Sequence, residues 1–150
     1  MRSMLSHPMI LISLLMLDPT THSAWGETTQ ADGIQWYVDL DEAWKSTCES
    51  GRPMLLFVTL EKCAYCVKMK NGTYNDDGVV SAITDTFVPA QVDGRQFEEL
   101  VVRLGIRVYP TTVIISPDRE VIDRVNGYVS AKVLQARLAT VPSHSRDKRR

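Results

Sequence analysis

Two cysteines in this sequence, Cys63 and Cys66, are separated only by Ala64 and Tyr65. They follow the apolar run 54–60, which predicts a buried strand, and the residues after Cys63 predict a helix. Residues three apart lie on one face of a helix, so the two sulfur atoms can join in a disulfide. A Cys-x-x-Cys pair at a strand-to-helix junction is therefore a candidate for thiol–disulfide exchange.

The two thiols should have different roles because they occupy different turns of the predicted helix. Cys63 lies in the first turn, where free backbone N–H groups and the helix dipole favour a thiolate. Lys62 adds a positive charge there, and Glu61 partly opposes it. We expect Cys63 to be the exposed nucleophile and Cys66 to be the more buried resolving thiol. The predicted cycle is attack by Cys63, a mixed disulfide, and release by Cys66.

Zinc binding and a purely structural disulfide are alternative interpretations of the pair. A structural zinc site needs four ligands, but there is no second Cys-x-x-Cys, and the histidines lie in the first 26 or the last nine residues (His7, His22 and His144). We therefore expect no metal and no other cofactor. A structural disulfide stays open, although so short a loop restricts little chain entropy. Cys48 has no partner in the sequence pattern. We expect it to be a small buried hydrophobic residue, with a regulatory thiol as the alternative.

Residues 1–26 have the pattern of a secretory signal peptide. A basic start precedes an apolar stretch over residues 9–17, which is too short to span a bilayer comfortably, and residues 24–26 offer a cleavage site. An uncleaved membrane anchor is the alternative, which Asp18 and Pro19 disfavour because they end the apolar stretch early. Export would place the cysteine pair in an oxidising compartment, either the bacterial periplasm or a eukaryotic secretory lumen, or outside the cell.

Length and charge predict one globular domain. One hundred and fifty residues are typical of one domain, and a net charge of −1 gives no electrostatic footprint for nucleic acid. We expect a linker over residues 27–33, a domain over residues 34–141, and a disordered, charged tail over residues 142–150. The chain has no room for a separate dimerisation domain, so we expect a monomer.

The hydrophobic pattern predicts alternating strands and helices, ending in a hairpin and a last helix. Strands are predicted over residues 34–38, 54–60, 87–92, 108–115 and 120–126; helices are predicted over residues 42–49, 63–74 and 97–104, after Asp76 or Asp77, and after Ser130. Trp44, Thr47 and Cys48 share one helical face, which should pack on the sheet. The fold class is therefore α/β, with a central mixed β-sheet flanked by helices on both faces.

Three features occur in the order found in the thioredoxin superfamily. They are Cys63-Ala64-Tyr65-Cys66 after a buried strand, Tyr109-Pro110-Thr111 before the hairpin, and Gly127 after it. Over about residues 34–140 the chain resembles this superfamily, and within it the exported, thioredoxin-related subgroup. The resemblance implies a thioredoxin-like fold in which Pro110 is cis and faces the cysteine pair. It also implies that Ala64, Tyr65, Tyr109, Pro110 and Thr111 contact substrate, with the Tyr109 backbone pairing with an extended segment.

The chain also departs from the thioredoxin pattern around the pair. Lys62 stands where the family usually has tryptophan, and Ala64-Tyr65 replaces Gly-Pro. Six residues before the first cysteine, where thioredoxins carry a buried acid, this chain has Phe57. That proton acceptor is therefore missing, and Glu61 or water would have to substitute for it.

These observations predict an extracytoplasmic thiol–disulfide oxidoreductase that reduces, forms or exchanges disulfides in exported proteins. Its substrates would be cysteine-containing exported proteins, and a separate redox partner would recharge it. We expect no nucleic-acid partner and no stable membrane insertion after signal cleavage. The alternatives are a thioredoxin-fold binding or chaperone module with a non-cycling disulfide, and a reductant dedicated to one pathway such as cytochrome maturation. The sequence does not favour one direction of electron flow.

Overall fold

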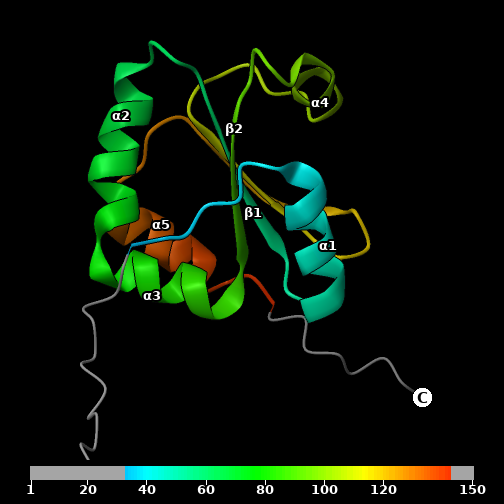
Figure 1. Ribbon diagram of the computed structural model, residues 1–150. Helices are drawn as coiled ribbons and strands as arrows, with labels where there is room; N and C mark the ends of the chain where they lie inside the picture. Colours follow the sequence, from blue (N-terminus) through cyan, green and yellow to red (C-terminus); the bar gives the residue numbers. More distant parts are fainter. Residues whose placement is uncertain (1–32, 143–150) are drawn as a thin grey trace, which may run out of the picture. The chain divides into compact units, whose positions relative to one another are not determined.

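The computed structural model describes residues 33–142; the predicted signal peptide, residues 27–32 of the linker and residues 143–150 of the tail lie outside this part. Its elements are α1 (Leu40–Ser50), β1 (Met54–Thr59), α2 (Ala64–Asn71), the 3-10 turn η1 (Thr73–Asn75), α3 (Asp77–Thr86), β2 (Val88–Asp93), α4 (Glu98–Arg103), β3 (Thr111–Ile115), β4 (Val121–Asn126) and α5 (Ala131–Leu138) (Figure 1). None of these helices is long and apolar enough to cross a membrane.

The strands form a four-stranded mixed sheet in the order β2-β1-β3-β4. β1 runs parallel to β2 and antiparallel to β3, and β3 pairs antiparallel with β4. The apolar sequence of β1 explains its inner position, because a strand with neighbours on both sides and helices on both faces meets no water. The predicted central strand and the predicted terminal hairpin are therefore confirmed.

Helices cover both faces of the sheet, as predicted (Figure 1). Successive side chains of β1 point to opposite faces. Leu55 and Phe57 join a core that includes buried residues of α2, α3 and α5. Leu56 and Val58 join a second core, which α1 and the α4 region cover. The two cores hold β1 from both sides and so fix the point where the chain leaves the sheet at Thr59.

Two predicted elements are shorter than the hydrophobic pattern suggested. Residues 34–38 do not form a strand but a single parallel bridge, between Tyr37 and Ala90. The helix predicted to Tyr74 ends at Asn71. Its continuation is a 3-10 turn, in which the Thr73 hydroxyl donates a 2.6 Å hydrogen bond to the carbonyl oxygen of Val129. This tertiary hydrogen bond replaces a further helical turn.

The strand predicted over residues 108–115 begins only at Thr111. Pro110 has no backbone N–H to pair with a neighbouring strand. The Thr111 hydroxyl instead turns back and donates to the carbonyl oxygen of Val108 at 2.6 Å. Residues 108–110 therefore form a loop at the edge of the sheet, and the functional site uses this loop.

The prediction for Cys48 is wrong, because its side chain is exposed. The buried residues of α1 are Ala43 and Thr47, whereas Trp44 is only half-buried. The helix is thus rotated by one residue from the predicted face. A small residue, Ala43, lies closest to the sheet, and the bulky Trp44 lies at the margin.

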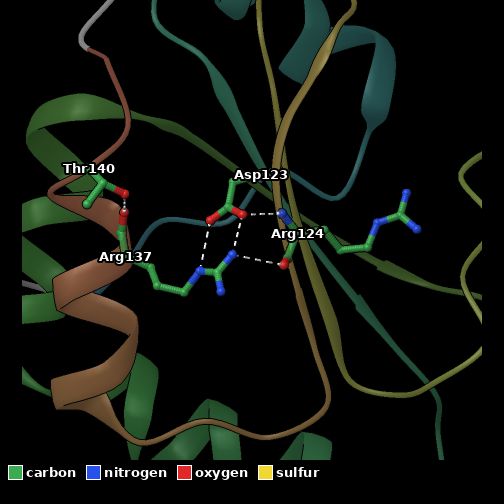
Figure 2. Close-up of polar contacts among 4 residues, drawn as sticks. All are labelled: Asp123, Arg124, Arg137 and Thr140. Carbon is green, nitrogen blue, oxygen red and sulfur yellow. Dashed lines mark hydrogen bonds and ion pairs between the residues drawn. The ribbon is translucent and has the colours of Figure 1, made fainter.

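An ion pair ties α5 to β4 (Figure 2). The Arg137 guanidinium donates to both carboxylate oxygens of Asp123, with Nε 3.0 Å from Oδ2, and to the carbonyl oxygen of Arg124. These hydrogen bonds from Arg137, with the Arg124 N–H, hold the pKa of Asp123 below its usual value despite partial burial. They stabilise the charged carboxylate, and therefore the folded state at neutral pH.

We expect Asp123→Asn to lower the free energy of unfolding at pH 7 by about 1 kcal/mol, because the pair is partly exposed. The folded pKa is lower than the unfolded one, which is about 3.9. The contribution is thus full above that value and is lost as the pH falls through the folded pKa. Urea denaturation at pH 7 and at about pH 3 measures the change. The exposed Asp118→Asn is the control. A destabilisation by Asp123→Asn that is the same at both pH values would contradict the prediction.

Candidate active site

Cys63 and Cys66 lie at the start of α2, just beyond the end of β1. Cys63 is the N-cap of α2, and its Sγ accepts a 3.1 Å hydrogen bond from the backbone N–H of Cys66. The two residues form a disulfide with a Cα–Cα distance of 5.2 Å. Cys63 is half-buried, whereas Cys66 is only 4% exposed. Solvent and partners can therefore reach the Cys63 side of the disulfide more easily.

The loop before β3 lies at the same edge of the sheet as the cysteine pair. β1 and β3 are antiparallel, and Val58 near the end of β1 pairs with Thr111 at the start of β3. The Tyr109–Pro110 peptide bond is cis. The N–H of Gly127 donates to the carbonyl oxygen of Pro110 at 2.7 Å, and Gly127 has a φ of +78°, which favours glycine. The hydrogen-bonded sheet thus brings two distant segments of the chain together.

The predicted substrate-contact residues differ in their accessibility. Ala64 and Tyr65 are exposed, and Tyr109 is half-buried. Pro110 and Thr111 are buried, and the Thr111 hydroxyl is already used in its bond to Val108. Side-chain contacts to a partner are thus available mainly from the α2 side of the site, and Thr111 has a structural hydrogen bond.

Tyr109 packs closely on the turn after β2. A Cβ at Gly94 would lie 2.8 Å from the Tyr109 ring, which is closer than side chains approach one another. Any larger residue at this position would displace the ring. Gly94 therefore sets the position of the Tyr109 ring, next to the cis bond.

Tyr128 is a site residue that the sequence reasoning missed. Its ring centroid lies 6.2 Å from that of Tyr65, and the Lys68 Nζ lies 4.5 Å above its ring. The cation over the aromatic face favours this packing, although both groups are near solvent. Tyr128 comes directly after Gly127, so its place next to a recognised motif residue was the available signal. The contact extends the exposed surface around Tyr65 to the segment between β4 and α5.

Glu61 was expected to oppose the positive charge of Lys62, but in the structure it forms an ion pair with Arg95. The Glu61 carboxylate is 2.5 Å from the Arg95 guanidinium, and the backbone N–H of Arg95 donates to Asp93 Oδ1 at 2.9 Å. Hydrogen bonding to Glu61 raises the pKa of Arg95. Arg95 therefore balances the charge of Glu61. Lys62, which is exposed, has no ion pair within residues 33–142.

An aromatic cluster occupies the place where thioredoxins carry a buried acid. Phe57 is fully buried, with its ring centroid 4.7 Å from Tyr74 and 5.8 Å from Trp36. The Tyr74 and Thr112 hydroxyls are hydrogen-bonded at 2.6 Å, and burial raises the pKa of Tyr74 well above its usual value. Tyr74 thus stays neutral, and the cluster contains no carboxylate.

A pocket of about 290 Å³ is lined by both Cys66 and Phe57. Its polar wall is formed by Thr59 at the end of β1, Glu61 just after it, Gln91 and Asp93 of β2, and Lys70 of α2. The Oε1 atom of Gln91 is buried and has no hydrogen-bond partner within the described residues. The same part of the chain contains no cluster of histidine, cysteine and acidic residues able to hold a metal ion.

A cysteine pair at a helix start, beside a cis-proline loop on a mixed sheet, defines the thioredoxin-like class of fold and supports thiol–disulfide oxidoreductase chemistry. The sequence model of the thioredoxin-like domain matches residues 40–142, so the chain belongs to this family. Among curated proteins, none matches the sequence significantly.

Solved structures agree with this assignment. A thioredoxin from Thermus thermophilus is 26% identical with a TM-score of 0.66, and the match covers 71% of this chain and 85% of that one. The DsbH oxidoreductase is 21% identical with a TM-score of 0.61, over 74% of this chain and 88% of that one. The oxidised C-terminal domain of DsbD from Neisseria meningitidis is 18% identical with a TM-score of 0.60, over 70% and 97%. The latter two similarities concern the fold alone.

Proposed function

We propose that this protein is an extracytoplasmic thiol–disulfide oxidoreductase that acts on cysteines of exported proteins. The observation that carries the proposal is the Cys63–Cys66 disulfide at the start of α2, beside the loop that ends in Pro110. The N-terminal signal pattern supports the location, although it lies outside the described residues. An exported chain would meet substrates whose cysteines are paired or are about to pair.

In the reducing direction, the Cys63 thiolate attacks one sulfur of a substrate disulfide. A Cys63–substrate disulfide forms, and the other substrate sulfur leaves as a thiolate. The Cys66 thiolate then attacks Cys63 Sγ, the internal disulfide forms, and the second substrate sulfur leaves. Two electrons pass from the protein to the substrate, and the reverse sequence oxidises a substrate dithiol. Cys63 is the proposed nucleophile because it is the more accessible of the two.

The surface around the disulfide supports an extended protein substrate. Tyr65 is 59% exposed, and Tyr128 lies against it. The backbone before Pro110 lies just before the start of β3, where an added segment can pair with it. We propose that Tyr65, Tyr128 and the Tyr109 backbone contact the residues that flank the substrate cysteine.

A Cys66→Ser variant should trap the mixed disulfide, because no resolving thiol remains to release the substrate from Cys63. The test uses Cys48→Ser in all proteins, since the exposed Cys48 would form unrelated disulfides. The reduced variant is mixed with oxidised insulin and with a periplasmic extract, and disulfide-linked adducts are resolved on non-reducing gels. We expect adducts that disappear with dithiothreitol and that Cys63→Ser abolishes.

Absence of adducts with both preparations would overturn the proposal. The redox potential of the Cys63–Cys66 pair is a second, independent readout. A potential below about −300 mV, typical of inert structural disulfides, would favour a binding module whose disulfide is not turned over.

A further inference from the structure

The second step of the proposed reaction needs a base, because the resolving cysteine attacks only as a thiolate. Cys66 is 4% exposed, so bulk water reaches its thiol poorly. Phe57 lines the same pocket as Cys66 and stands where thioredoxins carry a buried acid, so it offers no carboxylate there. A proton leaving Cys66 must therefore take another route.

The pocket beside Cys66 provides polar groups for such a route. Gln91 pairs in register with Phe57 on the neighbouring strand β1, and Asp93 is the last residue of β2. Both side chains line the pocket with Cys66. Two residues apart on one strand, they project from the same face of the sheet. The pocket, at about 290 Å³, has room for several water molecules, each of which takes about 30 Å³ in the liquid.

The buried Oε1 atom of Gln91, which has no hydrogen-bond partner among the described residues, marks where a water molecule would bind. A buried acceptor without a partner costs about 1–3 kcal/mol, so such atoms are normally paired with protein or with ordered water. Gln91 Oε1 is buried and without a partner among residues 33–142. A water that donates to this oxygen retains its second hydrogen and its lone pairs for neighbours in the same pocket.

We propose that Gln91 positions a water molecule through which the Cys66 thiol passes its proton to the carboxylate of Asp93. The inference rests on the proposed function and names the proton acceptor for its second step. Gln91 acts as a positioning residue, and Asp93 as the base. Cys66–SH gives its proton to the water, and the water gives a proton to Asp93. The Cys66 thiolate then forms the bond to Cys63 Sγ as the substrate thiolate leaves with the bonding electron pair.

Asp93 suits this role better than the other charged groups of the pocket. Its side chain is 21% exposed, whereas that of Glu61 is 67% exposed and is held by Arg95 at 2.5 Å. Arg95 contacts Asp93 only at Oδ1, so no hydrogen bond from the described residues reaches Oδ2. Lys70, the remaining charged group, is a cation and has no acceptor atom to offer.

Ellman's reagent, an aromatic disulfide, separates the two steps. In the reduced Cys48→Ser protein, attack by Cys63 releases one aromatic thiolate, and attack by Cys66 releases the second. Stopped-flow absorbance measures both releases between pH 6 and pH 8. We expect Gln91→Leu and Asp93→Asn to slow the second release about a hundredfold at pH 7, the lower end of general-base effects, while the first release changes less than twofold.

The pH profile distinguishes a proton route from a structural effect. In the slowed variants hydroxide must remove the proton, so the second release should rise nearly tenfold per pH unit, more steeply than with Asp93 in place. Gln91→Glu keeps an acceptor oxygen and should restore the rate. Asp93→Asn keeps a side-chain oxygen that can accept the hydrogen bond from the backbone N–H of Arg95, so the turn after β2 should be preserved. Gln96→Leu makes the same change at an exposed position and is the matched control.

Equal second-release rates in the Gln91→Leu, Asp93→Asn and control proteins would overturn the inference. So would a slowing without a change of pH profile, or a slowing by Glu61→Gln in place of Asp93→Asn. Insulin reduction by the same Cys48→Ser protein tests the proposed function separately. If the protein reduces insulin but the variants behave like the control, the oxidoreductase proposal stands and only the proton route fails.

Discussion

The Cys63→Ser variant should not accelerate insulin reduction above the background rate that dithiothreitol alone gives. A serine hydroxyl is not ionised at neutral pH and does not form a disulfide, so neither the mixed disulfide nor the internal one can form. Cys66 cannot replace the lost nucleophile, because it is 4% exposed and lies one turn inside α2. Turbidity of the precipitating insulin chains, with dithiothreitol as the electron donor, measures the reaction.

Cys48→Ser is the matched control for this experiment. It removes a thiol that is exposed on α1 and has no disulfide partner. We expect its rate to be within twofold of the unchanged protein. Insulin reduction by Cys63→Ser well above background would assign the nucleophile to another thiol, and loss of activity in both variants would indicate that Cys48 takes part.

Phe57→Ala should lower the free energy of unfolding by about 3–5 kcal/mol, the range for truncating a fully buried phenylalanine. The ring lies in contact with Trp36 and Tyr74, and β1 and its covering helices hold the surrounding side chains, so the resulting cavity cannot collapse fully. Urea denaturation monitored by circular dichroism measures the loss.

Phe57→Leu is the control, because it keeps most of the buried volume and should cost about 1–2 kcal/mol. A loss below about 1 kcal/mol for Phe57→Ala would mean that the aromatic cluster is not well packed.

The sequence predicted those features that depend on local pattern. An unbroken apolar run places β1 inside the sheet, and the spacing of Cys63 and Cys66 at a helix start brings their sulfur atoms together. The sequence-based prediction was less accurate for α1, where two neighbouring helical faces could pack on the sheet. One face carries Trp44 and Cys48, and the adjacent face carries Ala43 and Thr47, which are the buried residues. Periodicity alone does not say that the small residue meets the sheet and leaves Cys48 in solvent.

The polar wall beside Cys66 could not be predicted from local pattern. Gln91 faces Phe57 only because β2 pairs in parallel with β1 in this register, and that register depends on packing over the whole sheet. Tyr128 likewise meets Tyr65 only after β4 and α2 are in place. Chemistry at the cysteine pair is thus visible in the sequence, whereas its surroundings come from contacts between distant segments.

The inner position of β1 also determines how amide hydrogens exchange with solvent. β1 pairs with β2 on one side and β3 on the other, while β4 is hydrogen-bonded only to β3. Local opening begins at elements with few partners, and amides of central strands exchange only when most of the molecule opens. The cysteine pair follows β1, one of the two inner strands, which we expect to open late. Its disulfide can therefore form and break many times while the segment that carries it stays anchored, even when β4 and α5 open transiently.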